Sequence, residues 1–326
     1  MAERTRPSRR SLLVGIAAAL AAPTVFAQAG KRPRRVGIAF NGSTEAAKPY
    51  LDAFVRGMNE QGYGLNRDYA LETRHALGRN DRYPAMMGEL LRADSEVIVV
   101  GPNTGVEAAK AAAPSIPIVM AGATDPEATG LVASLSRPGG NVTGLAFNSA
   151  SLSAKRLQLL RDVVPGGLRI TYLMDPKAGG AAYVWRAMED AARALTLEIT
   201  GAGASTVEEL DQVLASMPAR RSDALMVGAA IFLFTHRARI IDFCAQHRTP
   251  AIYSYREAVT EGGLISYAAD LKETFQKAAA FVARILNGAK PADLPVEQPT
   301  RFELFVNMKT ADALGILTWA MERNAQ

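Results

Sequence analysis

Short apolar runs alternate with helical segments along almost the whole chain from residue 35 onward. Runs such as residues 36–40 and 96–100 are rich in β-branched residues and lack the apolar–polar alternation of a half-exposed strand. Such runs are typical of parallel strands covered by helices on both faces. The expected strands are residues 36–40, 69–73, 96–100, 116–120, 169–174, 197–200, 224–228, 251–253, 264–267 and 302–306.

The alternation breaks at one place, the Pro- and Gly-rich residues 125–144, and then restarts. Two units of similar size therefore flank one irregular crossover. A chain of 326 residues commonly divides into two domains. The pattern predicts an α/β fold of two units, each a parallel sheet with flanking helices. The expected helices are residues 50–61, 83–92, 106–112, 152–163, 182–195, 207–216, 235–247 and 271–287.

The N-terminus has the three-part layout of a secretory signal peptide. Four arginines within residues 4–10 precede an apolar run at residues 12–22, and residues 25–27 give a cleavage pattern. The apolar run is about half of the ~20 residues that span a bilayer. We therefore expect cleavage near Ala27 and no stable membrane insertion. A pair of arginines in the basic region also fits a twin-arginine signal, so the Sec and twin-arginine routes both stay open.

Most of the positive charge belongs to this targeting segment. The full chain has 37 basic and 32 acidic residues, a net charge of +5. Without residues 1–27, which hold four Arg and one Glu, 33 basic and 31 acidic residues would remain, a net charge of +2. Beyond residues 31–35 no basic block indicates nucleic-acid binding.

The sequence contains few of the residues from which catalytic and metal sites are built. Cys244 is the single cysteine and lies in the apolar stretch 240–244, so we expect it in a core. The three histidines are widely separated and form no metal-binding pair. The glycines after the first expected strand match neither a dinucleotide fingerprint nor a P-loop. We therefore predict no catalytic residue, no metal and no cofactor.

Four loops at expected strand ends carry small or hydrogen-bonding residues. In open parallel sheets, ligands bind at the carboxyl ends of the strands, beside helix N-termini with free N–H groups. Ser, Thr, Asn and Asp also cap helices, so each residue alone is compatible with capping. Four loops at one edge favour a binding cleft. The candidate residues are Asn41, Gly42, Ser43, Asn103, Thr104, Ala123, Thr124, Asp125, Ala230 and Phe232.

Several other candidates have two interpretations. Asp125 is compatible with binding an ammonium group or with capping a helix or turn. Asp175 with Pro176, and the run Tyr253–Tyr255, lie at strand ends of the second unit and are candidates to face the same cleft. Phe232 and Tyr267 are candidates to stack on a ligand, with ordinary packing as the alternative.

Several longer stretches, in order, resemble a single family. They are residues 116–126, 130–135, 137–144 (RPGGNVTG), 261–267 (EGGLISY) and 285–307. Over roughly residues 34–317 the chain resembles the ABC transporter substrate-binding protein family that includes tryptophan- and tyrosine-binding receptors.

The resemblance implies a type I periplasmic-binding protein fold, in which a three-segment hinge joins two Rossmann-like lobes with parallel sheets. We expect crossings near residues 142–146, 263–267 and 290–299. The N-terminal lobe would comprise residues 34–142 and 267–290, and the C-terminal lobe residues 143–266 and 291–326.

The resemblance also implies roles for the candidate residues. Residues 41–44, 103–104 and 123–125 would hold the polar head of a ligand from the first lobe. Asp175, residues 228–232 and Tyr253 would close over it from the second. Where many relatives have Gly after Ser266 and Tyr267, this chain has Ala268, Ala269 and Asp270, which we expect to reshape the pocket floor.

These observations together predict a periplasmic receptor of an ABC importer that is monomeric and captures a small polar solute by hinge closure. Its partners would be that small molecule and the transmembrane permease. An amino acid or small aromatic carboxylate is the leading solute, and a nucleoside-like or other carboxylate solute is the alternative. A sensor subunit for a membrane kinase and a periplasmic enzyme on the same fold stay open. A DNA-binding repressor of this fold would need a helix-turn-helix where this chain has its signal peptide.

Overall fold

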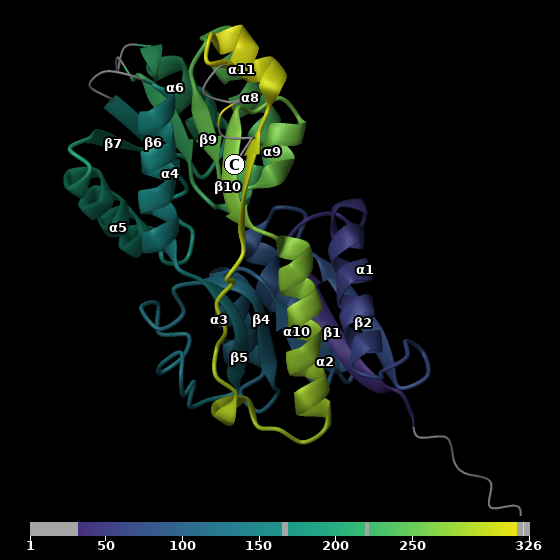
Figure 1. The fold of residues 1–326 in the computed structure, drawn as a ribbon. Helices are drawn as coiled ribbons and strands as arrows, with labels where there is room; N and C mark the ends of the chain where they lie inside the picture. The colour runs from purple at the N-terminus through teal and green to yellow at the C-terminus, as the bar shows by residue number, and fades with distance from the viewer. Residues whose placement is uncertain (1–31, 165–168, 219–221, 318–321, 323–326) are drawn as a thin grey trace, which may run out of the picture. The chain divides into compact units, whose positions relative to one another are not determined.

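The computed structural model describes residues 32–164, 169–218, 222–317 and 322 (Figure 1). The predicted signal peptide, residues 1–27, and the cleavage point near Ala27 lie outside this part of the chain. The chain from Pro33 onward forms one compact unit, which contains both predicted sheets.

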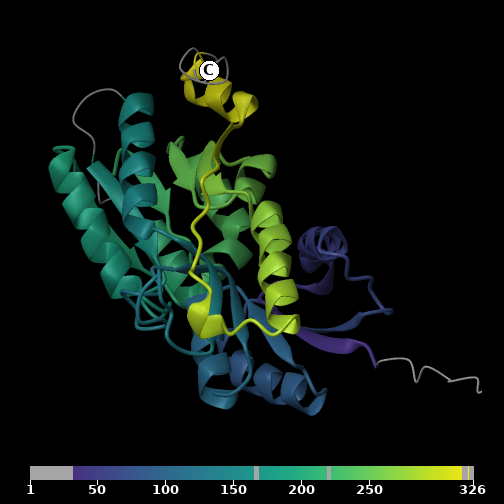
Figure 2. The same cartoon turned by 60° about the horizontal axis from the view of Figure 1, so that its bottom comes forward.

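The first sheet has five parallel strands in the order β2-β1-β3-β4-β5. Its buried strand residues, such as Ile98 and Val99, face helices on both sides, which explains the absence of polar alternation. Helix α10, far along the sequence, lies beside α1 in both views (Figures 1 and 2). The strands are β1 (Arg34–Phe40), β2 (Tyr69–His75), β3 (Val97–Val100), β4 (Ile118–Thr124) and β5 (Val142–Phe147), and the helices are α1 (Thr44–Glu60), η1 (Asn80–Arg82), α2 (Tyr83–Arg92), α3 (Asn103–Ala112) and α10 (Leu271–Leu286).

The second sheet has six strands in the order β11-β10-β9-β8-β6-β7. Neighbouring strands are parallel except β11, which pairs antiparallel with β10 at the edge. Strands β6 to β10 repeat the connectivity of strands β1 to β5 in the first sheet. The strands are β6 (Arg169–Met174), β7 (Glu198–Gly203), β8 (Ala224–Val227), β9 (Ala251–Tyr253), β10 (Ile265–Ala269) and β11 (Phe302–Val306), and the helices are α4 (Ser149–Val163), α5 (Ala181–Ala194), α6 (Val207–Ser216), α7 (Ile231–Thr235), α8 (Arg237–Gln246), α9 (Arg256–Thr260) and α11 (Met308–Leu314).

The predicted fold class is therefore confirmed: two Rossmann-like α/β lobes with essentially parallel sheets. We call the first sheet with its helices α1–α3 and α10 the first lobe. The second sheet with helices α4–α9 and α11 is the second lobe. Among the described residues, no helix combines the length and the apolar character needed to cross a membrane.

Strand pairing moves the three predicted lobe boundaries. Strand β5 pairs with β4 as far as Phe147, so the first crossing follows Phe147 and not residue 142. Strand β10 pairs with β11 through Ala269, which places the second crossing at Asp270 and not at residue 267.

The third boundary moves for the same reason. Residues 291–297, which include the short helix η3 (Pro291–Asp293), pack on the first lobe and not on the second. Thr143 Oγ1 donates to the Leu294 carbonyl over 2.6 Å, and Glu297 exchanges two backbone hydrogen bonds with β5. The crossing therefore falls at residues 298–301, just before β11.

Two helices differ from the sequence expectation. Helix α1 begins at Thr44 and not near residue 50, because Ser43 caps it by accepting from the Ala46 N–H and Pro49 is tolerated within it. The expected helix 235–247 corresponds to α8, and the short helix α7 precedes it where a loop was expected; the two helices meet at His236. Because α1 starts early, the first of the four candidate loops is short and consists of residues 41–43 at the end of β1.

Candidate functional site

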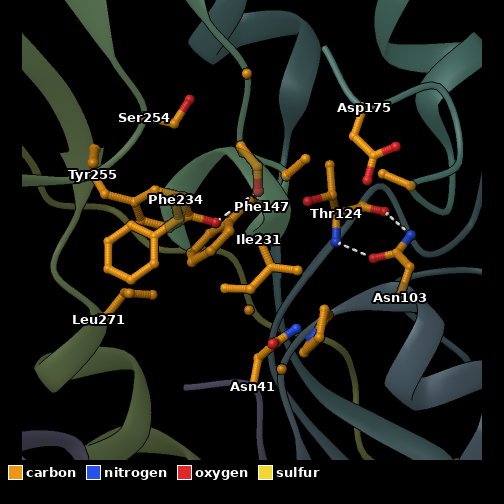
Figure 3. Close-up of a pocket in the computed structure, with 18 of the residues that line it drawn as sticks. Asn41, Asn103, Thr124, Phe147, Asp175, Ile231, Phe234, Ser254, Tyr255 and Leu271 are labelled. Atoms are coloured by element: carbon orange, nitrogen blue, oxygen red, sulfur yellow. Dashed lines mark hydrogen bonds between the residues drawn. The ribbon is translucent and has the colours of Figure 1, made fainter. Parts of the chain in front are cut away.

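A pocket of about 490 Å³ lies where the carboxyl ends of the strands in both sheets meet (Figure 3). This volume is in the usual range for a site that takes a small molecule. The first lobe lines it with residues that include Phe40, Asn41, Gly42, Tyr50, Asn103, Thr104, Thr124 and Phe147, and the second with Ser153, Arg156, Tyr172, Asp175, Ala230, Ile231, Phe234, Arg237, Ser254, Tyr255 and Glu257.

Asn103 fixes one corner of the pocket. It is the first residue of α3 and is 6% exposed. Its Nδ2 donates to the Thr124 carbonyl over 2.8 Å, and its Oδ1 accepts from the Thr124 N–H over 2.7 Å (Figure 3). The side chain thereby ties the start of α3 to the end of β4, and it has little capacity left for a ligand.

Backbone N–H groups at the same corner are free to donate hydrogen bonds to a ligand. The first N–H groups of a helix have no partner within it. In α3 these belong to Asn103 and Thr104, since the Gly105 and Val106 N–H groups already donate to Pro102. The Thr104 hydroxyl lines the pocket and has no hydrogen-bond partner among the described residues.

A bulge in β4 decides which residues of its end face the pocket. The register with β5 shifts between Ala121 and Ala123, with Gly122 at φ +103°. A Cβ at Gly122 would lie 2.7 Å from the Phe147 ring. Gly122 and Thr124 therefore line the pocket, whereas Ala123 is fully buried in the core.

The loop after β1 contributes Asn41 and Gly42. Asn41 is buried, and its Nδ2 donates to Asn80 Oδ1 over 3.3 Å. Its own side-chain oxygen is buried with no hydrogen-bond partner in the described structure. A buried acceptor of this kind is costly to leave unpaired, so it is available to a ligand donor or a water.

Aromatic rings line much of the pocket. Phe40 stacks on Tyr50 with centroids 5.5 Å apart, and Phe234 meets Tyr255 edge to face at 4.9 Å. In Figure 3 Phe147, Phe234 and Tyr255 gather on one side, with Asn103, Thr124 and Asp175 on the other. Aromatic walls with a few fixed polar groups suit a solute that has both an apolar body and a polar end.

The pocket tyrosines are neutral hydrogen-bonding groups. Burial raises the pKa of Tyr172 and of Tyr255 to about 12. Burial, together with the neighbouring Glu257 carboxylate, also raises the pKa of Tyr50 above its ordinary value. All three therefore stay protonated at physiological pH.

Helix α4 presents a polar face to the pocket. Ser149, Ser153 and Arg156 are buried, and together with Leu152 they line it at helical spacing. Arg156 is 7% exposed, and its Nε donates to the Tyr267 carbonyl over 2.9 Å. Burial lowers the pKa of the Arg156 guanidinium to about 10, so it still carries its charge at neutral pH.

Two other charged side chains of the second lobe that line the pocket, Arg237 and Asp175, have hydrogen-bond or ion-pair partners. Arg237 pairs with Glu261 over 2.5 Å and lies over the Phe234 ring. Asp175 is buried, and its Oδ1 accepts from Ser205 Oγ over 2.5 Å and from the Lys177 N–H over 2.9 Å. The second oxygen of Asp175 has no hydrogen-bond partner among the described residues, which leaves it free for a donor.

Of the fourteen candidate residues, the structure brings seven together at this pocket. Six of them lie in the predicted strand-end loops, and Asp175 follows β6. Seven others do not line it. The lining residues are Asn41, Gly42, Asn103, Thr104, Thr124, Asp175 and Ala230, and the others are Ser43, Ala123, Asp125, Phe232, Tyr253, Tyr267 and Asp270.

Capping explains three of the seven that fall outside. Ser43 caps α1. Asp270 caps α10 by accepting from the Lys272 and Glu273 N–H groups, so it is Ala268 and Ala269 that form the pocket floor beside it. Asp125 accepts from the Ser149 N–H and hydroxyl at the start of α4. Its carboxylate is therefore engaged at the start of α4.

The three aromatic candidates that do not line the pocket, Phe232, Tyr253 and Tyr267, pack against other parts of the second lobe. Phe232 packs beside His236, with ring centroids 4.7 Å apart, while Ile231 and Phe234 share the face of α7 that lines the pocket. Tyr253 is buried in the core, and Ser254 and Tyr255 beyond the strand line the pocket instead. Tyr267 stacks on Phe302, so packing is the interpretation that holds for it.

Sequence reasoning missed Tyr50, Arg156, Phe234, Arg237 and Glu257. Arg156 has a signal in the sequence, because it lies on the same helical stripe as Leu152, Leu160 and Val163, all of them buried. A charged residue on an apolar stripe is unusual enough to indicate a function. The other four belong to helices or loops whose exact start decides which side chain faces the pocket.

Comparison with known proteins shows the family. The chain matches the family of ABC transporter substrate binding proteins over residues 35–321, nearly the whole of the compact unit. The chain belongs to this family. Its members are substrate-binding proteins, and among the described residues no cluster of three His, Cys, Asp or Glu side chains is placed to hold a metal ion.

Individual similar proteins are distant in sequence, and the solved structures among them share the fold. A tyrosine-binding protein of Clostridioides difficile is 25% identical over 289 residues, 87% of this chain and 81% of the relative. The ABC domain from Streptococcus pneumonia in complex with L-Trp superposes with a TM-score of 0.81 at 21% identity, covering 87% of this chain and 95% of that one. The ligand-free, open structure of a substrate-binding protein with adhesive properties from Clostridium difficile gives a TM-score of 0.66 at 21% identity, with the same coverages.

Proposed function

We propose that this protein is the solute receptor of an ABC importer and that it captures an amino acid or small aromatic carboxylate. The observation that carries the proposal is the pocket between the two lobes. Its walls combine aromatic rings from both lobes with a few buried polar groups, among them Asn41, Arg156 and Asp175. A solute with an aromatic body and a charged polar end would match these walls.

The family members support the same class of solute. One relative is a tyrosine-binding protein, and a structural neighbour holds L-Trp. Both ligands have an aromatic ring and an α-carboxylate. Among the polar groups of this pocket, buried Arg156 suits a carboxylate and the free Asp175 oxygen suits an ammonium group.

Capture would proceed by hinge closure about the three crossings at residues 148, 270 and 298–301. A ligand that touches both lobes binds the closed state better than the open one, and it shifts the population by that difference in affinity. Contacts between the lobes already include the hydrogen bond from the Tyr50 hydroxyl to Glu257. Short crossings allow such a rotation without breaking either sheet.

The proposed setting is the periplasm, reached by export with the N-terminal signal peptide near residues 1–27. The closed receptor, as a monomer, would deliver its solute to the transmembrane permease of the importer. The rival assignments are a sensor subunit that presents the same solute to a membrane kinase and, further away, a periplasmic enzyme.

A thermal-shift screen of the purified protein against amino acids, aromatic acids, nucleosides and sugars tests the proposal. Solute at a hundred times its Kd adds about 2.7 kcal/mol to the free energy of unfolding, which raises Tm by several degrees. We expect the response in the aromatic amino acid and aromatic acid group. A response confined to sugars or nucleosides would contradict the proposed solute class.

A further inference from the structure

Of the two arginines that line the pocket, Arg156 is the one whose buried charge has no ion-pair partner among the described residues. It lies on the pocket face of α4 and is 7% exposed. Burying an unpaired charge is costly, and proteins ordinarily pair such a group or bind something to it. Within the described part of the chain it forms one hydrogen bond, from Nε to the Tyr267 carbonyl, which uses one of the five N–H donors and supplies no negative charge.

The nearby carboxylates do not supply that charge. Among the described residues, none of the ion pairs includes Arg156. Glu257 accepts from Tyr50, Asp125 accepts from Ser149, and Asp175 accepts from Ser205 and the Lys177 N–H. Burial is the main cause that lowers the Arg156 pKa, and the neighbouring groups that would raise it are tyrosine hydroxyls and not carboxylates.

We propose that Arg156 is the residue that binds the carboxylate of the captured solute, so that an anionic group is what the pocket selects for. The inference rests on the proposed function, since it specifies how the same pocket recognises its solute. The free N–H groups of a guanidinium form a planar fork that matches two carboxylate oxygens. Ser153, 2% exposed and one turn earlier on the same face, adds a hydroxyl without another partner among the described residues.

A purely structural Arg156 would behave differently from a ligand anchor. A structural arginine stabilises the ligand-free protein through its hydrogen bond to Tyr267. An anchor without a counter-ion destabilises it, because its desolvation is compensated only when the solute arrives. The two roles therefore predict opposite effects of a neutral side chain of similar size on the ligand-free protein.

The first test uses the unaltered protein and titration calorimetry. L-Tryptophan is compared with tryptamine, which lacks the carboxylate, and with indole-3-propionic acid, which lacks the ammonium group. We expect tryptamine to bind on the order of 100-fold more weakly than L-tryptophan, and the acid to keep more of the affinity than the amine. Tryptamine binding as tightly as L-tryptophan would overturn the role of Arg156 while leaving a solute receptor in place.

The second test compares Arg156→Met with Arg161→Met, an exposed arginine on the same helix. We expect Arg156→Met to lose the L-tryptophan response and to melt, without ligand, at or above the wild-type Tm. Arg161→Met should bind as the wild type does. An Arg156→Met protein that melts several degrees lower would overturn the proposal. If none of the three probes binds the wild type, the proposed solute class fails, and the ligand-free Tm of Arg156→Met still decides the role of Arg156.

Discussion

At the scale of single residues, the pocket divides its work between side chains that shape it and groups that face the solute. Asn103 and Thr104 are neighbours in sequence at the start of α3 and both line the pocket. The Asn103 side chain forms three hydrogen bonds to protein atoms, two with Thr124 and one with Thr129. The Thr104 side chain forms none within the described structure. The first therefore holds the corner together, and the second is free to meet a ligand.

We predict that Asn103→Ala lowers the free energy of unfolding by about 1–3 kcal/mol, because it leaves the Thr124 N–H and carbonyl without buried partners. Thr104→Ala, the matched neighbour, should change stability by less than about 0.5 kcal/mol. Urea unfolding, monitored by circular dichroism, measures the free energy of unfolding of both variants. Equal losses for the two variants would show that Asn103 does not hold the corner.

The sequence was sufficient to predict which loops line the pocket, but not always which side chain within them. The small and polar loops at strand ends placed Asn41, Gly42 and Thr124 at the pocket, because parallel sheets bring those loops to one edge. The exact side chain was harder to choose. Phe234 and not Phe232 faces the pocket, because α7 begins at Ile231, and a shift of one or two residues in a helix start turns another side chain inward.

At the scale of elements, helices α1 and α10 pack tightly together, although they come from opposite ends of the first lobe's sequence. Gly57 permits it: a Cβ there would lie 2.3 Å from the Gln276 carbonyl oxygen and 2.8 Å from the Ala279 Cβ. Since α10 enters the first lobe directly after the second crossing, this contact fixes where the hinge meets the lobe.

We predict that Gly57→Ala destabilises the protein by about 1–3 kcal/mol, because the backbone of α10 must move away to admit a methyl group. Gly88→Ala in α2 is the control. Its added Cβ would meet only the Arg92 side chain at 4.0 Å, so greater helix propensity should stabilise the protein by about 0.5–1 kcal/mol. Thermal unfolding distinguishes the two, and a stabilising Gly57→Ala would refute the close packing.

Elements were predictable where burial left a clear pattern. Strand β3 and the buried residues 36–39 of β1 were identifiable as continuous apolar runs, because both faces of a parallel sheet are covered. Boundaries were less accessible. Nothing in residues 142–147 distinguishes a strand of the first sheet from a crossing, since that choice depends on long-range pairing with β4.

At the scale of the whole molecule, one interlobe contact links closure to the pocket. Tyr50 of α1 donates its hydroxyl to Glu257 of α9, and both line the pocket. A hydrogen bond to a charged group contributes about 1.5–3 kcal/mol. If it forms only when the lobes close, that energy contributes to solute affinity.

We predict that Tyr50→Phe weakens solute binding by about 10-fold or more, with less effect on the stability of either lobe. Tyr63→Phe is the control, since the Tyr63 hydroxyl donates to Asn287 Oδ1 over 2.8 Å within the first lobe alone. Titration calorimetry on both variants checks this. Equal affinities for Tyr50→Phe and the wild type would mean that the contact has no part in capture.

Whether this pocket captures an aromatic amino acid is best decided by the heat capacity change when such an amino acid binds the wild-type protein. Titrations with L-tryptophan and L-tyrosine at several temperatures give it. Burying an aromatic ring between two closing lobes predicts one-to-one binding with a clearly negative heat capacity change. No binding of either amino acid, or of any aromatic carboxylate, would contradict the account of this pocket as the capture site for such a solute.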